Sequence, residues 1–99
     1  MKKKINMKRF TINGLVDCIG EFAIERAGYK FYFVTDGSTC WLIEYSTGVS
    51  AGEFMFIKEY AYKKKLLKQL DLPDYKIKKA IENQIPLLKQ KGIEYPVNK

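Results

Sequence analysis

The apolar residues change their spacing near residue 56, and this change limits the folds open to the chain. Residues 10–55 alternate apolar and polar side chains in short runs, separated by the pairs Asn13-Gly14, Ala27-Gly28 and Asp36-Gly37. A period of two indicates strands, and Asn-Gly is a strong hairpin signal. Residues 56–92 repeat their apolar positions every three or four residues, which is typical of amphipathic helices. The sequence therefore predicts an α+β fold, an antiparallel β-meander of four to five strands followed by two amphipathic helices packed on one face.

The chain has 99 residues, which predicts a single domain. We expect residues 1–9 to form a basic arm that is mobile at its start and residues 10–55 to form the meander. A short strand over residues 49–54 would be the fifth strand. Residues 56–92 are predicted to form the two helices, and residues 93–99 an extended tail that can lie back on the sheet.

Residues 15–27 fit two structures. Val16, Cys18, Phe22 and Ile24 alternate as in a strand, but Leu15, Ile19, Phe22 and Ala23 also fit a helical stripe. Gly20 would cost a helix about 1 kcal/mol, and β-forming residues dominate, so the strand is favoured. In a strand, Gly20 would mark a bulge or a bend.

The last helical stretch carries a stripe of aliphatic residues and clear signals for its end. The stripe consists of Ile77, Ile81, Ile85 and Leu88. Pro86 lacks a backbone N–H, so a kink or break is expected there. Gly92 followed by Ile93 is typical of a Schellman cap.

Basic residues concentrate at the two ends of the chain. The formal net charge is +7, and residues 11–57 hold six acidic and only two basic side chains. This layout favours a polyanionic partner for the ends, and a solvated, solubilising surface is the alternative. The candidate nucleic-acid or phosphate contacts are Lys2, Lys3, Lys4, Lys8, Arg9, Lys30, Lys64, Lys65 and Lys68.

Aromatic residues are dense in the predicted strands, and two helices can cover only one face of the sheet. Some aromatic rings on the other face are therefore expected to be exposed. The candidate partner-binding residues on that face are Tyr32, Trp41 and Tyr45. The alternative is that these rings form cross-strand pairs that stabilise the sheet.

The sequence argues against an enzyme. It contains no histidine, and it lacks nucleophile-elbow, phosphate-loop and zinc-protease motifs. No cofactor and no metal site are predicted. Cys18 and Cys40 are interpreted as free thiols of a reducing cytoplasm. The longest apolar runs are too short for a membrane span, and no signal peptide is indicated, so a cytoplasmic location is expected.

The segment Trp41-Leu42-Ile43-Glu44-Tyr45-Ser46-Thr47-Gly48, followed by a short strand and a lysine-rich helix, resembles a W-x-x-E-x-x-T-G pattern in small uncharacterised bacteriophage and mobile-element accessory proteins. The resemblance implies a regulator, a DNA-binding factor or an inhibitor of host defences. The acidic, aromatic middle between two basic ends then favours a non-enzymatic binding protein that acts on a host nucleic-acid-handling machine, for example as an inhibitor of a CRISPR-type defence. The expected partner is a host protein or nucleoprotein complex, with the chain a monomer or weak homodimer. The alternative is direct, low-specificity nucleic-acid binding through the lysines.

Overall fold

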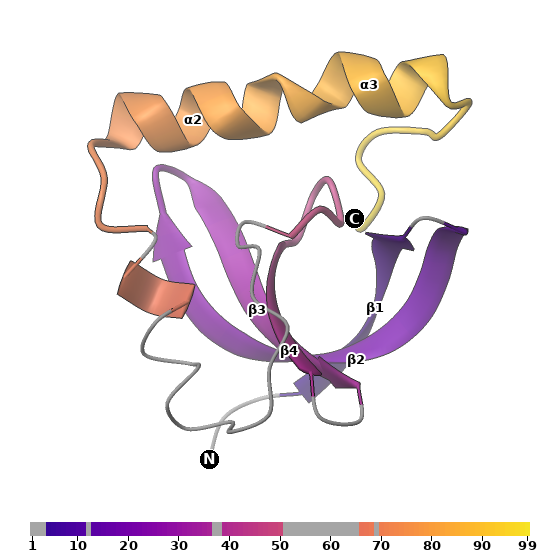
Figure 1. Ribbon diagram of the computed structural model, residues 1–99, viewed down its shortest axis with the longest axis horizontal. Coiled ribbons are helices and arrows are strands. Elements are labelled where there is room, and N and C mark those ends of the chain that lie inside the picture. Colours follow the sequence, from indigo (N-terminus) through magenta and orange to yellow (C-terminus); the bar gives the residue numbers. More distant parts are fainter. Residues whose placement is uncertain (1–3, 12, 37–38, 51–65, 69) are drawn as a thin grey trace.

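Four antiparallel strands form one sheet in the order in which they occur in the chain. The computed structural model describes residues 4–11, 13–36, 39–50, 66–68 and 70–99. The strands are β1 (Lys4–Thr11), β2 (Gly14–Arg26), β3 (Tyr29–Asp36) and β4 (Thr39–Glu44), and helices α2 (Asp74–Glu82) and α3 (Gln84–Gln90) follow (Figure 1). The predicted α+β class with a meander is confirmed.

Two predicted elements lie largely outside the described residues. Ser50 forms an isolated bridge to Ile43, and residues 51–54 of the predicted fifth strand are not described. Of the predicted first helix, the structure describes residues 66–68, which are helical, and Leu70. Both α2 and α3 fall within the second predicted helix.

The first hairpin starts earlier and turns one residue sooner than the sequence indicates. β1 begins at Lys4, so residues 4–9 of the predicted basic arm belong to the sheet. Thr11 pairs with Gly14, so Gly14 belongs to β2 instead of to the turn. The Thr11 hydroxyl donates a hydrogen bond to the Gly14 carbonyl at 2.9 Å, and Gly14 has a φ of +99°. This side-chain bond closes the loop in the shifted register.

Residues 14–26 form a strand, as the sequence favours, but the bulge is not at Gly20. The pairing of β2 with β3 shifts between Phe22 and Ile24 instead. Gly20 is buried and pairs with strands on both sides. A Cβ at Gly20 would lie 3.2 Å from the Cβ of Tyr32 and would collide with the Met7 sulfur. The glycine is therefore required for close packing between β1 and β3.

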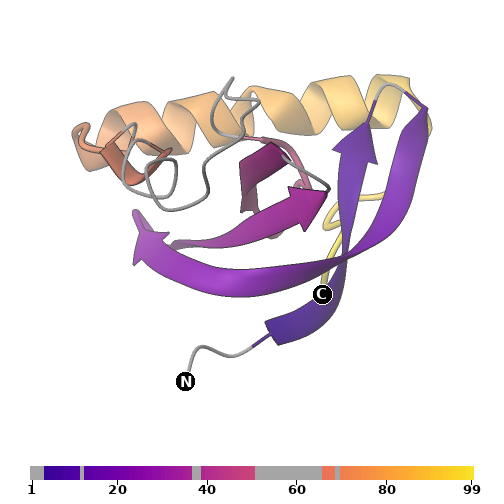
Figure 2. The same cartoon turned by 60° about the horizontal axis from the view of Figure 1, so that its bottom comes forward.

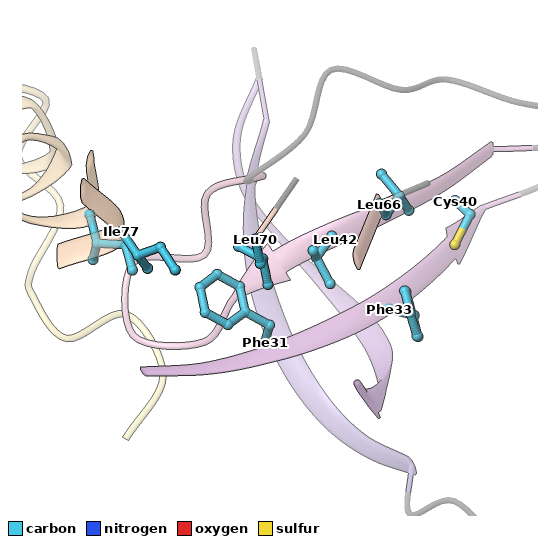
Figure 3. Packing of buried hydrophobic residues seen from close by; sticks show 8 residues of the cluster. Phe31, Phe33, Cys40, Leu42, Leu66, Leu70 and Ile77 are labelled. Carbon is cyan, nitrogen blue, oxygen red and sulfur yellow. The ribbon is translucent and has the colours of Figure 1, made fainter. Parts of the chain in front are cut away.

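One face of β3 and β4 packs against the helical part of the chain. Phe31 and Leu42 are fully buried there (Figure 3). The buried members of this cluster are Phe31, Phe33, Cys40, Leu42, Leu66, Leu70, Ile77 and Ile81. Ile77 and Ile81 belong to the aliphatic stripe of the sequence, so this stripe packs α2 against the sheet.

The opposite face is not left open, which corrects the expectation of an exposed aromatic face. The sheet curls strongly, so that β1 swings across this face (Figure 2). Met7 of β1 joins Tyr32, Val34 and Ile43 in a second buried cluster. Tyr32 is only 9% exposed as a result. The sheet thus has buried residues on both faces.

Helices α2 and α3 lie end to end, with the break one turn before Pro86 (Figure 1). Pro86 cannot donate to the carbonyl of Glu82, the last residue of α2, so the interruption appears at Asn83 instead of at the proline. The predicted Schellman cap is confirmed. Ile93 N donates to the Leu88 carbonyl at 2.9 Å, and Gly92 has a φ of +74°.

The C-terminal tail lies between β1 and the end of β4, as the sequence allows. Val97 N donates to the Ser46 carbonyl at 2.7 Å. The side-chain amide of Asn98 bonds both the N–H and the C=O of Lys8 at 2.7 Å, and its nitrogen also donates to the Tyr45 carbonyl at 2.8 Å. Asn98 thus takes the place of a strand residue beside β1.

Candidate functional site

The two hairpins of the sheet diverge and leave a groove between them. β2 pairs with β1 along Gly14–Glu21, but its pairing with β3 starts only at Gly20. The groove has a volume of about 810 Å³ and is lined by Arg9, Thr11, Asn13, Val16, Asp17, Cys18, Ile19, Val34, Thr35 and Trp41. We call it the Arg9–Trp41 groove.

Arg9 and Trp41 give the groove its name because their side chains are stacked. The guanidinium carbon of Arg9 lies 4.2 Å from the centroid of the Trp41 ring. A cation over an indole face is attracted by the negative centre of the ring. Both residues were candidates from the sequence, Arg9 for phosphate contact and Trp41 for partner contact, and the curl of the sheet brings them together. The stack combines a positive charge with a broad apolar surface.

The other two candidate aromatic residues contribute less to an accessible site. Tyr32 is buried, so its ring offers no stacking surface to a partner. Tyr45 is half-buried, and its hydroxyl donates to the Lys99 carbonyl at 3.1 Å. The centroids of these two rings are 5.3 Å apart, and Phe22 packs edge-on to Tyr32 at 5.5 Å. These pairs match the alternative in which the rings stabilise the sheet.

The candidate lysines of the sheet lie directly opposite acidic residues. In the strand register Lys4 is opposite Glu21, Lys8 is opposite Asp17 and Lys30 is opposite Glu25. Such placement offsets each positive charge and interrupts a continuous phosphate track. Lys68 is exposed, and Lys2, Lys3, Lys64 and Lys65 lie outside the described residues.

Glu44 of the W-x-x-E-x-x-T-G segment is buried at 2% exposure, and its carboxylate is fully engaged. It accepts hydrogen bonds from the backbone N–H and the hydroxyl of Ser46 at 2.7 and 2.8 Å. It also accepts from the N–H and hydroxyl of Thr47 at 3.0 and 2.9 Å. Although Glu44 lines a cavity of about 270 Å³ beneath α2, its bonds hold a turn and give it a structural role.

Cys18 lies in the groove, although the sequence predicted only that it is a free thiol. Burial raises the pKa of the Cys18 thiol above its ordinary value, the Arg9 guanidinium lowers it and Asp17 raises it further. The net direction is upward, so the thiol is protonated and weakly nucleophilic at neutral pH.

We expect iodoacetamide to alkylate Cys18 of the folded protein several-fold more slowly at pH 8 than in the urea-unfolded chain, with the rate still rising above pH 9. Fully buried Cys40 is the internal control and should stay unmodified until the chain unfolds. Mass spectrometry of quenched samples measures both sites. Rapid labelling of Cys18 at pH 7 would contradict the assigned environment.

Sequence reasoning could not find the groove as a unit. Arg9 and Trp41 lie 32 positions apart, on strands that are not neighbours in the sheet. Only the curl of the sheet brings them into contact, and no local pattern reports that curl. Among the described residues, no helix has the length and apolar character to span a membrane. Comparison with known protein families, curated proteins and solved structures finds no match to this chain.

Proposed function

We propose that this chain is a non-enzymatic binding protein and that the Arg9–Trp41 groove holds a protein partner. The carrying observation is the Arg9–Trp41 stack in an open groove whose lining mixes apolar and polar side chains. Tryptophan and arginine are the side chains most enriched among residues that dominate protein–protein binding energy. In the setting implied by the resemblance to mobile-element proteins, the partner belongs to a cytoplasmic host machine that handles nucleic acid, such as a CRISPR-type defence complex.

The surroundings of the groove support a protein partner over nucleic acid. Ile19, which lines the groove, is 61% exposed. Exposed apolar side chains of this size are typical of protein-binding surfaces. The lysines of the sheet face carboxylates in register, which weakens the case for phosphate contact.

The first test measures fluorescence anisotropy of labelled double-stranded DNA, single-stranded DNA and RNA across a salt titration. Trp41 is the only tryptophan, so its intrinsic emission reports groove occupancy in the same samples. We expect no binding near physiological salt. Micromolar binding that weakens steeply with salt would instead establish the direct nucleic-acid function.

The second test captures the partner from bacterial extract on the immobilised protein and compares two variants. Trp41→Ala removes the ring beneath Arg9 and should weaken capture at least tenfold. Tyr75→Ala is the matched control, because Tyr75 is an aromatic residue of α2 with 67% exposure outside the groove. Equal capture by both variants, with the fold intact, would refute the groove as the binding site.

A further inference from the structure

The hydrogen bonds of β1 show which backbone groups of the first hairpin point outward. Lys8 N donates to Asn98 Oδ1, and Phe10 N donates to the Gly48 carbonyl at 2.8 Å. Neither acceptor belongs to β2, so the N–H groups of Lys8 and Phe10 point away from β2. Residues directly opposite each other in an antiparallel pair either share both hydrogen bonds or turn both sets of groups outward.

The residues of β2 opposite these two positions therefore direct their own backbone groups to the other side. Asp17 lies opposite Lys8, and Leu15 lies opposite Phe10. Their N–H and C=O groups point away from β1, and the alternation of the strand extends this to Ile19. Pairing with β3 begins at Gly20, whose own N–H and C=O face β1, so the Gly20–Val34 pair is held by the flanking residues and engages the Ile19 carbonyl with Thr35. Leu15 and Asp17 lie before this pairing, so within the described residues the edge of β2 is open at these two positions.

The outer edge of β1 is covered by other parts of the chain, whereas the open part of the β2 edge is not covered by any described residue. At Lys8 and Phe10 the outer edge of β1 is covered by Asn98 and by the turn at Gly48. The open edge of β2 instead borders the Arg9–Trp41 groove, which Val16, Asp17 and Cys18 help to line. Exposed edges are templates for pairing with another chain, and natural proteins usually cover them. An open edge beside a groove is the arrangement that strand-adding peptides use.

The open edge of β2 could pair with a second copy of this chain or with a different protein, and the charges of the chain favour a different protein. A second copy would carry the same net charge of +7, and a symmetric pairing centred on Asp17 would set that carboxylate against itself. Like charges directly opposite destabilise paired strands. An acidic segment is attracted by the overall positive charge, and unlike a symmetric second copy it can place an uncharged residue opposite Asp17 and its carboxylates on the Arg9 side of the groove.

We propose that the groove recognises its partner by β-strand addition, in which an extended acidic segment of the partner protein pairs with β2 at residues 15–17. The inference rests on the proposed function and specifies how that same groove binds. The backbone groups of Leu15 and Asp17 supply the ladder. Trp41 and the exposed side chain of Ile19, which both line the groove, receive apolar side chains from the segment.

The test selects peptides from a random twelve-residue display library against the full chain and uses the most enriched peptide as the probe. We expect net acidic sequences with apolar residues at alternate positions. Hydrogen exchange followed by NMR should show at least tenfold slower exchange of the Leu15 and Asp17 amides with the peptide bound. The amides of Val16 and Cys18, which point toward β1, should change little.

A pair of variants separates the backbone from the side chain. Asp17→Pro removes an outward N–H without removing a bond to β1, and should weaken peptide binding at least tenfold. Asp17→Ala keeps the N–H and should bind within about threefold of the parent chain. Circular dichroism checks that both variants fold.

The outcomes distinguish the two proposals. Failure to enrich any peptide, or a bound peptide that leaves the Leu15 and Asp17 amides unprotected, would overturn strand addition. If Trp41→Ala loses the captured partner while Asp17→Pro keeps it, the groove is the binding site but strand addition is wrong. If both variants keep the partner, the proposed function fails as well.

Discussion

Replacing Gly48 with alanine should destabilise the protein by about 3 kcal/mol or more. Gly48 has a φ of +69°, where an alanine costs about 1 kcal/mol or more. A Cβ there would also lie 3.1 Å from the Lys8 carbonyl oxygen and 3.3 Å from both the Arg9 Cα and the Phe10 nitrogen. These neighbours are backbone atoms of β1, which cannot rotate away as a side chain would. The alanine must push β1 off the turn and weaken the hydrogen bond from Phe10 N to the Gly48 carbonyl.

Gly92→Ala is the matched control, since Gly92 has a similar φ of +74° and a Cβ on it would meet no heavy atom within 4 Å. It should lose only about 1 kcal/mol, the cost of the backbone conformation alone. Urea unfolding of both variants, followed by the emission of Trp41, measures the difference. Equal losses would mean that β1 does not pack against the turn. Because Arg9 belongs to the displaced strand, Gly48→Ala should also shift the Trp41 emission before unfolding.

The turn shows what local patterns can and cannot predict. Thr47-Gly48 indicates the end of a strand, and the structure ends β4 at Glu44. The alternation does not show that the Glu44 carboxylate is buried, because an acidic residue in a strand is ordinarily assigned to the solvent face. Burial is possible here since the next residues, Ser46 and Thr47, supply four donors to one carboxylate. Such local donation depends on the backbone path of the turn.

The candidate site was predictable only in its parts. Alternation correctly places Tyr32, Trp41 and Tyr45 on one face of the sheet, where they join or border a single cluster. It cannot show that β1 covers Tyr32 and leaves Trp41 at the groove, because sheet curvature is not a periodic signal. The curvature depends on Gly20, which admits Met7 between the strands, and on the bulge after Phe22. Gly20 in the sequence indicates that the strand can bend, but it does not indicate the direction in which the sheet curls.

Glu44→Ala should destabilise the protein by about 2–4 kcal/mol. The substitution removes the acceptor for the backbone N–H groups of Ser46 and Thr47 and for both hydroxyls. Thr47 is 1% exposed, so water cannot replace the lost acceptor at that residue without opening the turn. A buried donor left without a partner costs about 1–3 kcal/mol. Glu44→Ala also removes the free-energy cost of burying a charged carboxylate, and this gain offsets part of the loss in stability. The offset sets the upper limit of the expected destabilisation.

Two further variants assign this loss to the carboxylate. Glu82→Ala removes an exposed glutamate at the end of α2 and should change stability by less than about 0.5 kcal/mol. Glu44→Gln keeps one acceptor oxygen but turns an NH₂ group toward donors, so its loss should fall between those of the two alanine variants. A Glu44→Gln variant as stable as the parent chain would contradict the four-donor arrangement. Since this turn also supplies the Gly48 carbonyl to Phe10, Glu44→Ala should speed alkylation of Cys18 as well, because loss of the turn frees the strand that covers the thiol.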